Sequence, residues 1–228
     1  VLSLTPLANL RQKITFLLWG KQYDAELSLS GQFQAENTLT ALMLVLASNP
    51  NSWENPLAVE PYLPQLAGLD AIRGRLEKID NSNHPAHFFV DYAHTETALA
   101  TTLAALRPLT RGRLIVVFGC GGNRDPFKRA KMGKVAAEMA DVAIITDDNP
   151  RHEDPRTIRA AILSACPKGI EATSRQEAIG TAVAMAEMGD IVLVAGKGHE
   201  TGQIVGDNIL PFDDAVVIKN MIDNHAQR

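Results

Sequence analysis

Residues 142–151 read Val-Ala-Ile-Ile-Thr-Asp-Asp-Asn-Pro-Arg. The four apolar residues predict a buried strand, and the polar residues after it indicate contact with something beyond the strand's carboxyl end. Pro150 disfavours helical backbone at Asn149, which fixes the polar side chains near a turn. Asp148 and Arg151 then offer an acceptor and a forked donor, a pair that suits a ligand with an ammonium and a carboxylate group. A polar loop with a local ion pair is the alternative.

Strand and helix patterns alternate from residue 85 to the end of the sequence. Apolar runs predict strands at residues 88–92, 114–118, 142–145, 170–173 and 191–195. Helix starts are indicated by Thr95, by Asp154 followed by Pro155, and by Ser174. Repeated strand–helix units are typical of a parallel sheet covered by helices on both faces. We therefore predict an α/β fold with a mainly parallel sheet.

Residues 1–84 have a different pattern. Two short runs, at residues 14–19 and 25–30, predict a hairpin. Apolar residues at helical spacing between residues 39 and 46 predict an amphipathic helix. A polar stretch at residues 80–85 indicates a linker. So few elements make a poor domain alone, and we expect this segment to be the end of a larger one.

The composition is that of an ordinary globular protein. The 228 residues are 46% hydrophobic and 21% charged, and the net charge of −4 argues against a nucleic-acid partner. Cys120 and Cys166 are the only cysteines, which predicts neither a disulfide framework nor a zinc site. No apolar run suits a membrane span and the first residues lack a signal-peptide pattern, so we expect a cytoplasmic protein without a membrane partner.

Polar or glycine-rich segments follow four of the predicted strands. They lie at residues 91–94, 119–125, 148–151 and 196–200. The carboxyl ends of parallel strands share one edge of a sheet, and ligands of such sheets bind there. Four such segments on one edge predict a pocket.

The glycine-rich loop at residues 119–125 precedes a predicted helix, so its backbone amides could hold an anion. It is not a dinucleotide fingerprint, because Arg124 replaces the third glycine; Arg124 suggests a carboxylate or phosphate ligand instead. Lys128, Arg129 and Lys131 follow in the first helical turn, where the helix dipole disfavours cations. They indicate either an anionic partner or a solvated basic face.

The segment at residues 196–200 could direct Glu200 toward a substrate ammonium, or it could be a flexible loop with a surface lysine. Asp91 could be a helix cap. His94 and His199 have no metal-ligand spacing, and no serine or cysteine lies in a nucleophile elbow. We therefore predict neither a metal site nor a catalytic triad among these residues.

In this order, the motifs resemble the Mur ligases of peptidoglycan synthesis. The resemblance rests on Asn37, Gly74-Arg75, Asp91-Tyr92-Ala93-His94-Thr95, the loop from Phe118 to Asp125, Asp148-Asn149-Pro150-Arg151 and Gly196-Lys197-Gly198-His199-Glu200. The last two motifs resemble the branch that adds diaminopimelate. The resemblance implies ATP-dependent amide bond formation that joins meso-diaminopimelate to UDP-N-acetylmuramoyl-L-alanyl-D-glutamate, with ATP and Mg²⁺ as cofactors.

The resemblance also implies domains and site residues. Residues 1–84 would be the C-terminal part of the central ATP-binding domain, and residues 85–228 the Rossmann-like C-terminal domain. The implied diaminopimelate contacts are Arg124, Asp148, Asn149, Pro150, Arg151, Gly196 and Glu200. The implied ATP contacts are Asn37 at the adenine, Arg75 at the phosphates and Asp91 at the ribose.

Two departures from the family pattern stand out. Glu96 replaces a proline that mainly sets a first helical turn. No Gly-x-x-x-x-Gly-Lys-Ser/Thr phosphate loop occurs in these residues, so we expect a fragment of a monomeric ligase that is inactive alone. The resemblance implies that the family's phosphate loop and its carbamylated, magnesium-binding lysine lie upstream of Val1. The alternatives are a MurF, folylpolyglutamate or cyanophycin type of ligase, or a non-catalytic module that binds an amino acid.

Overall fold

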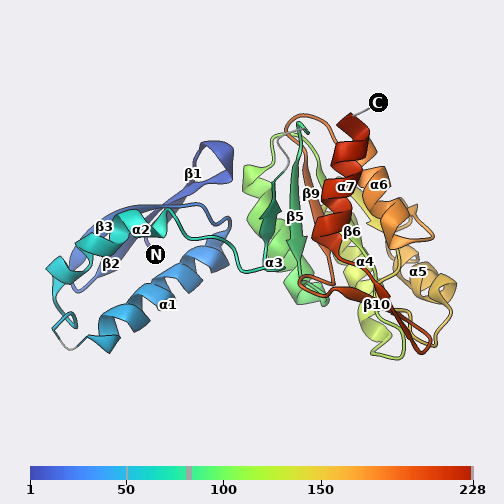
Figure 1. The fold of residues 1–228 in the computed structure, drawn as a ribbon, viewed down its shortest axis with the longest axis horizontal. Coiled ribbons are helices and arrows are strands. Elements are labelled where there is room, and N and C mark those ends of the chain that lie inside the picture. The colour runs from blue at the N-terminus through green and yellow to red at the C-terminus, as the bar shows by residue number, and fades with distance from the viewer. Residues whose placement is uncertain (50, 81–83, 227–228) are drawn as a thin grey trace. The chain divides into compact units, whose positions relative to one another are not determined.

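The computed structural model describes residues 1–49, 51–80 and 84–226, which form two compact units, Val1–Ala71 and Ile72–Arg228 (Figure 1). The boundary expected after residue 84 therefore lies inside the second unit. The reason is that strand β4 (Glu77–Ile79) pairs antiparallel with strand β5 (His87–Asp91) and so joins the sheet of that unit. Part of the predicted linker, residues 81–83, falls outside the described residues.

The first unit is a three-stranded antiparallel sheet with one long helix. Its elements are β1 (Ser3–Pro6), η1 (Ala8–Leu10), β2 (Gln12–Leu18), β3 (Lys21–Leu27), α1 (Gln32–Ser48), η2 (Pro56–Ala58), η3 (Glu60–Tyr62) and α2 (Leu63–Leu66). The predicted hairpin is β2–β3, and its turn residues Trp19 and Gly20 have φ values of 49° and 77°. Left-handed backbone at both positions matches the twist of paired strands.

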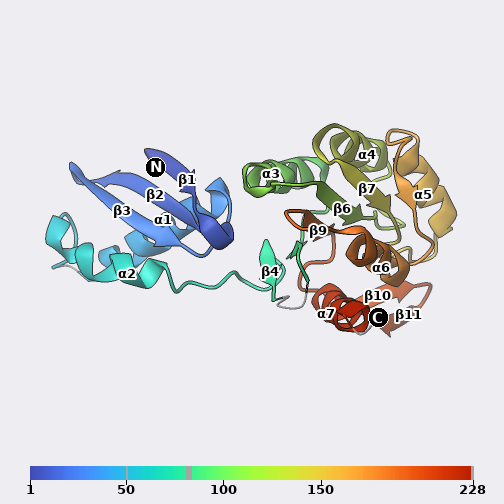
Figure 2. The ribbon, with the colours of Figure 1, turned by 90° about the horizontal axis from the view of Figure 1, so that it is seen from above.

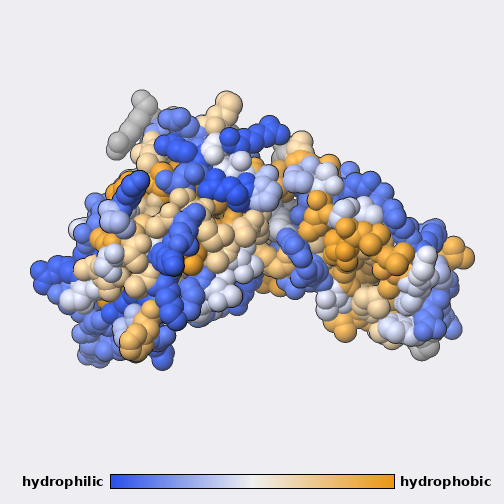
Figure 3. Space-filling view, turned by 180° about the vertical axis from the view of Figure 1, so that it is seen from behind, coloured by the Kyte–Doolittle hydropathy of each residue, from blue (hydrophilic) through white to orange (hydrophobic). Residues whose placement is uncertain are grey.

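Hydrophobic side chains also reach the surface of the first unit. Leu44 and Val45 of α1 are exposed, as is Leu17 of β2. Figure 3 shows hydrophobic side chains gathered on this unit. A helix that is apolar on more than one side is normally covered on those sides. In the described part of the chain, no helix is long and apolar enough to cross a membrane.

The second unit is built on a six-stranded sheet in the order β4-β5-β9-β6-β7-β8. Its further elements are α3 (Glu96–Leu106), η4 (Arg107–Leu109), β6 (Leu114–Phe118), α4 (Phe127–Met139), β7 (Val142–Ile145), α5 (Pro155–Leu163), β8 (Ile170–Glu171), α6 (Arg175–Met185), β9 (Ile191–Ala195), β10 (Gly202–Val205), β11 (Asn208–Pro211) and α7 (Asp214–Ala226). All neighbouring strands except the edge pair β4–β5 are parallel. The predicted α/β fold with a mainly parallel sheet is confirmed.

Helices cover both faces of this sheet. Figure 2 shows α3, α4 and α5 on one face and α6 and α7 on the other. Every residue of the central strands β6 and β9 is buried, as expected for strands covered on both faces. The sheet is therefore a rigid base for the loops at its carboxyl edge.

Three predicted helix caps are formed. The side chains of Thr95, Asp154 and Ser174 each accept a hydrogen bond from a backbone N–H of the first turn that follows. Such a cap typically contributes about 1 kcal/mol. The hairpin β10–β11 was not predicted, and it lies against the carboxyl edge of the sheet through a bridge between Arg151 and Val205.

Candidate functional site

The carboxyl ends of β5, β6, β7 and β9 surround one cavity of about 460 Å³. All four polar segments that follow these strands contribute side chains or backbone to it. Six of the seven residues predicted to contact diaminopimelate line the cavity: Arg124, Asp148, Asn149, Arg151, Gly196 and Glu200. The seventh, Pro150, is not among the lining residues. The structure thus brings together segments that lie far apart in the sequence.

Arg151 is held at the cavity by the β10–β11 hairpin. Its backbone N–H donates to the Ile204 carbonyl at 3.0 Å, and its own carbonyl accepts from the Gly206 N–H at 2.7 Å. Its φ of 53° is the left-handed backbone that this connection requires. The Nη1 atom of its guanidinium donates to the carbonyls of Gly122 and Asn149, at 3.1 and 3.3 Å. No described residue accepts from Nε or Nη2, which leaves these donors for a ligand.

Asp148 lies deeper in the cavity. The residue is 8% exposed, and no donor among the described residues forms a hydrogen bond with its carboxylate. Burial raises the pKa of Asp148, while the charges of Arg175 and Lys197 oppose that rise. A buried carboxylate without a donor is costly unless a ligand supplies one. Asp148 therefore has the properties of an ammonium-binding group.

Gly196 allows this arrangement. Its φ is +117°, and a Cβ at this position would lie 2.7 Å from Oδ2 of Asp148. Any side chain would therefore displace the carboxylate as well as strain the backbone. A glycine is therefore needed directly after β9, because the Asp148 carboxylate lies against it.

Asn149, Lys197 and Glu200 form a hydrogen-bonded triangle next to Asp148. The Nζ of Lys197 lies 3.0 Å from Oδ1 of Asn149 and 3.0 Å from Oε2 of Glu200. The Asn149 amide nitrogen donates to the same Glu200 oxygen at 3.0 Å. Burial works to raise the pKa of Glu200, but the bonds from Asn149 and Lys197 together lower it, so the carboxylate is held charged.

The side chain of Lys197 is completely buried, so the alternative of a flexible loop with a surface lysine is wrong. The sequence signal for this burial was the pair of glycines that flank Lys197 after a wholly apolar strand. Gly196 and Gly198 both adopt positive φ, which turns the chain back over the sheet. Arg175 was also missed. It is fully buried and forms a bidentate pair with Asp214, with both N–O distances at 2.7 Å.

Charge is divided across the cavity. Its acidic side chains are Asp148, which is buried, and Glu200, which is partly exposed; its basic side chains are Arg124, which is exposed, and Arg151 and Lys128, which are partly exposed. A ligand with an ammonium group at one point and a carboxylate at another would meet opposite charges at both. The cavity is therefore matched to an amino acid rather than to a simple anion.

Two backbone N–H groups of the glycine-rich loop are already bonded within the protein. The Gly122 N–H donates to the Asn149 carbonyl, and the Asn123 N–H donates to Glu153. A Cβ at Gly119 would lie 2.2 Å from the Thr146 carbonyl oxygen. The glycines are needed because the loop packs directly against the segment after β7.

The basic residues at the start of α4 also have partners within the protein. Arg129 forms a bidentate pair with Glu153, at 2.6 and 2.7 Å, and is itself buried. The Nζ of Lys128 donates to the His94 carbonyl at 2.7 Å, and Lys131 lies 3.5 Å from Glu96. These contacts explain their positions without an external anion, and only Lys128 lines the cavity.

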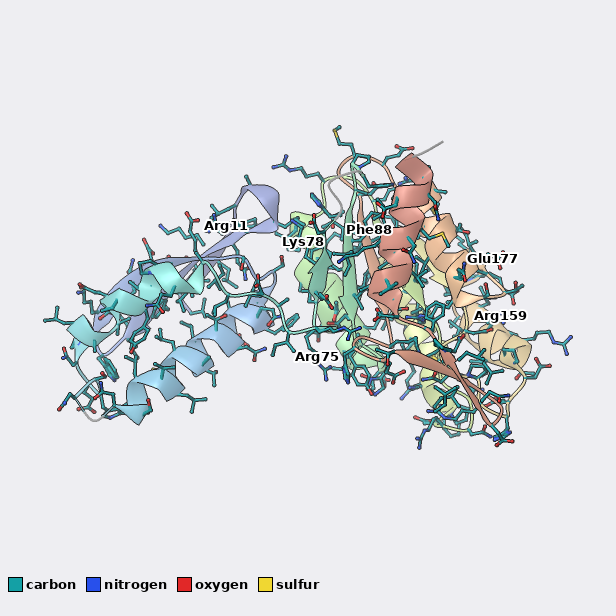
Figure 4. The ribbon with its side chains drawn as sticks, in the orientation of Figure 1. Arg11, Arg75, Lys78, Phe88, Arg159 and Glu177 are labelled. Carbon is teal, nitrogen blue, oxygen red and sulfur yellow. The ribbon has the colours of Figure 1, made fainter. Side chains whose placement is uncertain are left out.

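The predicted ATP contacts lie in both units. Asn37 is on the exposed side of α1 in the first unit. In the second unit, Arg75 lies over the ring of Tyr92 with 4.7 Å to the centroid, at the carboxyl end of the sheet (Figure 4). His94 and His199 also contact the Tyr92 ring, with centroid distances of 4.7 and 5.4 Å. This aromatic and basic surface borders the cavity, which Tyr92 and His94 also line.

Asp91 is already engaged within the protein. Its carboxylate accepts from the backbone N–H groups of Leu76 and Ala93 at 2.7 and 2.8 Å, and from the Thr102 hydroxyl at 3.3 Å. Burial raises the pKa of Asp91 despite these bonds. The carboxylate thus connects the segment before β4 to the end of β5. Within the described residues, no group of three or more His, Cys, Asp or Glu side chains could hold a metal ion.

Known proteins share both the sequence and the fold of this chain. Residues 74–198 match the family described as Mur ligase, glutamate ligase domain. A UDP-N-acetylmuramoyl-L-alanyl-D-glutamate–2,6-diaminopimelate ligase of Zymomonas mobilis is 46% identical over 215 residues, which are 92% of this chain and 43% of that protein. The corresponding ligase of Bradyrhizobium diazoefficiens is 49% identical over 203 residues, which are 89% of this chain and 40% of that protein.

A solved structure of a ligase with the same name has a TM-score of 0.70 and 34% identity. The match covers 94% of this chain and 43% of the chain in that structure. MurF ligase from Thermotoga maritima, at 14% identity and a TM-score of 0.65, shares the fold. This chain spans less than half the length of these relatives. It belongs to the Mur ligase family.

Proposed function

We propose that the second unit is the amino-acid-binding domain of a ligase that adds meso-diaminopimelate to UDP-N-acetylmuramoyl-L-alanyl-D-glutamate with the use of ATP. The observation that carries the proposal is the buried carboxylate of Asp148, which lacks a hydrogen-bond donor among the described residues and faces a cavity bordered by Arg124 and Arg151. Relatives that bear the name of this ligase support it.

The cavity offers a reason to prefer diaminopimelate over lysine. Diaminopimelate carries one more carboxylate than lysine. The Nε and Nη2 donors of Arg151 and the second amide hydrogen of Asn149 are available to receive it, whereas lysine would leave them desolvated without an acceptor. Asp148 and Glu200 would bind the ammonium group beside that carboxylate.

In the proposed reaction, ATP converts the glutamate γ-carboxylate into an acyl phosphate, and the free amine of diaminopimelate displaces phosphate to form the amide. The described residues contribute by binding: they hold the distal ammonium and carboxylate so that the reacting amine is presented in one orientation.

For the first unit, we propose the C-terminal part of the central ATP-binding domain, with Asn37 near the adenine of ATP. The apolar side chains Leu44 and Val45 support this role, since the outer side of α1 would then be covered by the remainder of that domain. Arg75 and Asp91 remain the proposed ATP contacts of the second unit. Asp91 would act indirectly, by holding the segment before β4 through its bond from the Leu76 N–H.

The proposal is tested in the complete protein that contains these residues. Arg151→Ala should raise the KM for diaminopimelate by at least about tenfold, the value of one charge-assisted contact, and leave the KM for ATP within about twofold. Arg156→Ala is the matched control, because Arg156 is an exposed arginine of α5 that pairs only with Asp154 among the described residues. An Arg151→Ala variant with the parent kcat/KM for diaminopimelate would exclude this role for Arg151.

A further inference from the structure

Lys197 is a buried cation next to the cavity but does not line it. Its ammonium group has two partners, the carbonyl oxygen of the Asn149 side chain and one carboxylate oxygen of Glu200, both at 3.0 Å. A completely buried ammonium is costly unless it is paired. One of its partners, Asn149, follows β7, and the other, Glu200, follows β9. The lysine thus joins the ends of β7 and β9 at the point where the proposed ligand contacts are made.

The contact fixes which way the Asn149 amide faces. Its Oδ1 accepts from Lys197 and also from the backbone N–H of Ile204 at 2.9 Å. A reversed amide would point its own N–H groups at these two donors, so only one orientation is compatible with the surroundings. The amide nitrogen is then directed toward Glu200, with its second hydrogen left for another acceptor.

The contact also gives the two carboxylate oxygens of Glu200 different roles. Oε2 receives bonds from both Lys197 and Asn149, while no donor of the described residues reaches Oε1. Glu200 is partly exposed in the cavity, so Oε1 is the oxygen that remains for a ligand donor. Without the lysine, Oδ1 of Asn149 would keep only the bond from Ile204, and Oε2 of Glu200 only the bond from Asn149, so both groups would be held less firmly.

We propose that Lys197 is a positioning residue for diaminopimelate selection, which orients the Asn149 amide toward a ligand carboxylate and the Glu200 carboxylate toward a ligand ammonium. This inference rests on the proposed function. Lys197 itself does not touch the ligand. Its removal should act on the binding of diaminopimelate through Asn149 and Glu200.

The test is a double-mutant cycle in the complete protein, with Lys197→Met, Asn149→Ala and the double variant. Lys197→Met should raise the KM for diaminopimelate by at least about tenfold while the KM for ATP stays within about twofold. Because Lys197 acts through Asn149 as well as Glu200, adding Lys197→Met to Asn149→Ala should raise the KM by a clearly smaller factor than Lys197→Met does in the parent. Fully additive effects, or an unchanged KM in Lys197→Met, would overturn the assignment.

Arg113→Met is the matched control. Arg113 pairs with the buried carboxylate of Asp190 at 2.7 Å, at the opposite end of β9 from the cavity. Both substitutions remove a cation from a carboxylate, but only Lys197→Met should change the KM for diaminopimelate.

The outcomes separate this inference from the proposed function. If the parent protein does not use diaminopimelate, both the proposed function and the role of Lys197 are wrong. If the parent uses it and Lys197→Met leaves its KM unchanged, only the role of Lys197 is wrong. If Lys197→Met does not fold, a crystal structure of the parent with diaminopimelate decides. The amide nitrogen of Asn149 on a ligand carboxylate, with Lys197 still on Oδ1, supports the assignment; loss of the Lys197–Asn149 contact on ligand binding contradicts it.

Discussion

Replacing Asp148 with asparagine should stabilise the second unit and weaken ligand binding at the same time. The residue is 8% exposed and its carboxylate has no hydrogen-bond donor among the described residues, so its charge is buried at a net cost. Arg175 and Lys197 offset part of that cost. Asn retains an unpaired polar group but removes the charge, and we expect a gain of about 1 kcal/mol at pH 8.

The pH dependence gives the sign of the effect. Burial raises the pKa of Asp148 above its value in the unfolded chain. The neutral acid is therefore favoured in the folded state, and the stability of the parent is lost as the pH rises through the raised pKa. The difference between Asp148→Asn and the parent should be largest at pH 8 and shrink as the pH falls below that raised pKa toward the value of the unfolded chain. Asp207→Asn is the control, because Asp207 is 94% exposed.

Unfolding of the second unit can be followed selectively. Both cysteines of the sequence, Cys120 and Cys166, are buried in this unit, and burial raises the pKa of Cys120 to about 12, so the folded thiol reacts poorly. Labelling by a dithiodipyridine across a urea series therefore reports opening of this unit. Fluorescence of the two tryptophans, Trp19 and Trp53, reports the first unit.

In the complete protein, Asp148→Asn should also weaken diaminopimelate binding by at least about tenfold, because a neutral amide replaces a charged acceptor. A variant that is less stable than the parent at pH 8, or a stability difference that does not change with pH, would refute the account of Asp148 as a buried charge awaiting a ligand ammonium.

Two further predictions concern the same region. Gly196→Ala should destabilise the second unit by about 1–3 kcal/mol, measured by the thiol-labelling urea series, because φ is +117° and the new Cβ would lie 2.7 Å from Oδ2 of Asp148; an unchanged midpoint would contradict the close approach. Arg175→Met should cost about 3–5 kcal/mol in the same measurement, because it leaves the buried Asp214 carboxylate without its partner, and a loss below about 1 kcal/mol would contradict the pair's importance.

The central sheet could be predicted because local pattern and tertiary environment agree there. Val142–Ile145, Leu114–Phe118 and Ile191–Ala195 are continuous apolar runs, and each is a buried strand with the predicted bounds. The helix starts at Thr95 and Asp154 could be predicted because a cap is a local interaction. Four polar strand ends on a parallel sheet then share an edge by topology alone.

Other features depend on contacts that are distant in sequence. The hairpin Gly202–Pro211 is mostly exposed and lacks an apolar alternation, so no periodicity marks it. Its position follows from bonds to residues 148–151, such as that from Gln203 to the Asp148 carbonyl at 2.7 Å. The second unit begins at Ile72 rather than after residue 84 for the same reason. The pairing of Glu77–Ile79 with His87–Asp91 is not visible in either segment alone.

The roles of charged residues were the hardest to predict. A lysine between two glycines suggests a surface loop, yet Lys197 is buried because acceptors from two strand ends surround it. Arg159, which Figure 4 labels, belongs to α5 and pairs with Asp147 and Glu171, so even the acid next to Asp148 has a structural role. Charge partners of this kind become visible only once the strand order is known.

Amino-acid selectivity of the complete protein tests the central claim most directly. The assay supplies ATP, UDP-N-acetylmuramoyl-L-alanyl-D-glutamate and either meso-diaminopimelate or lysine, and it measures kcat/KM for each amino acid. We predict that diaminopimelate is preferred by at least about a hundredfold, since lysine leaves the free donors of Arg151 and Asn149 without an acceptor. Equal use of the two amino acids, or a preference for lysine, would contradict the account of the cavity as a diaminopimelate site.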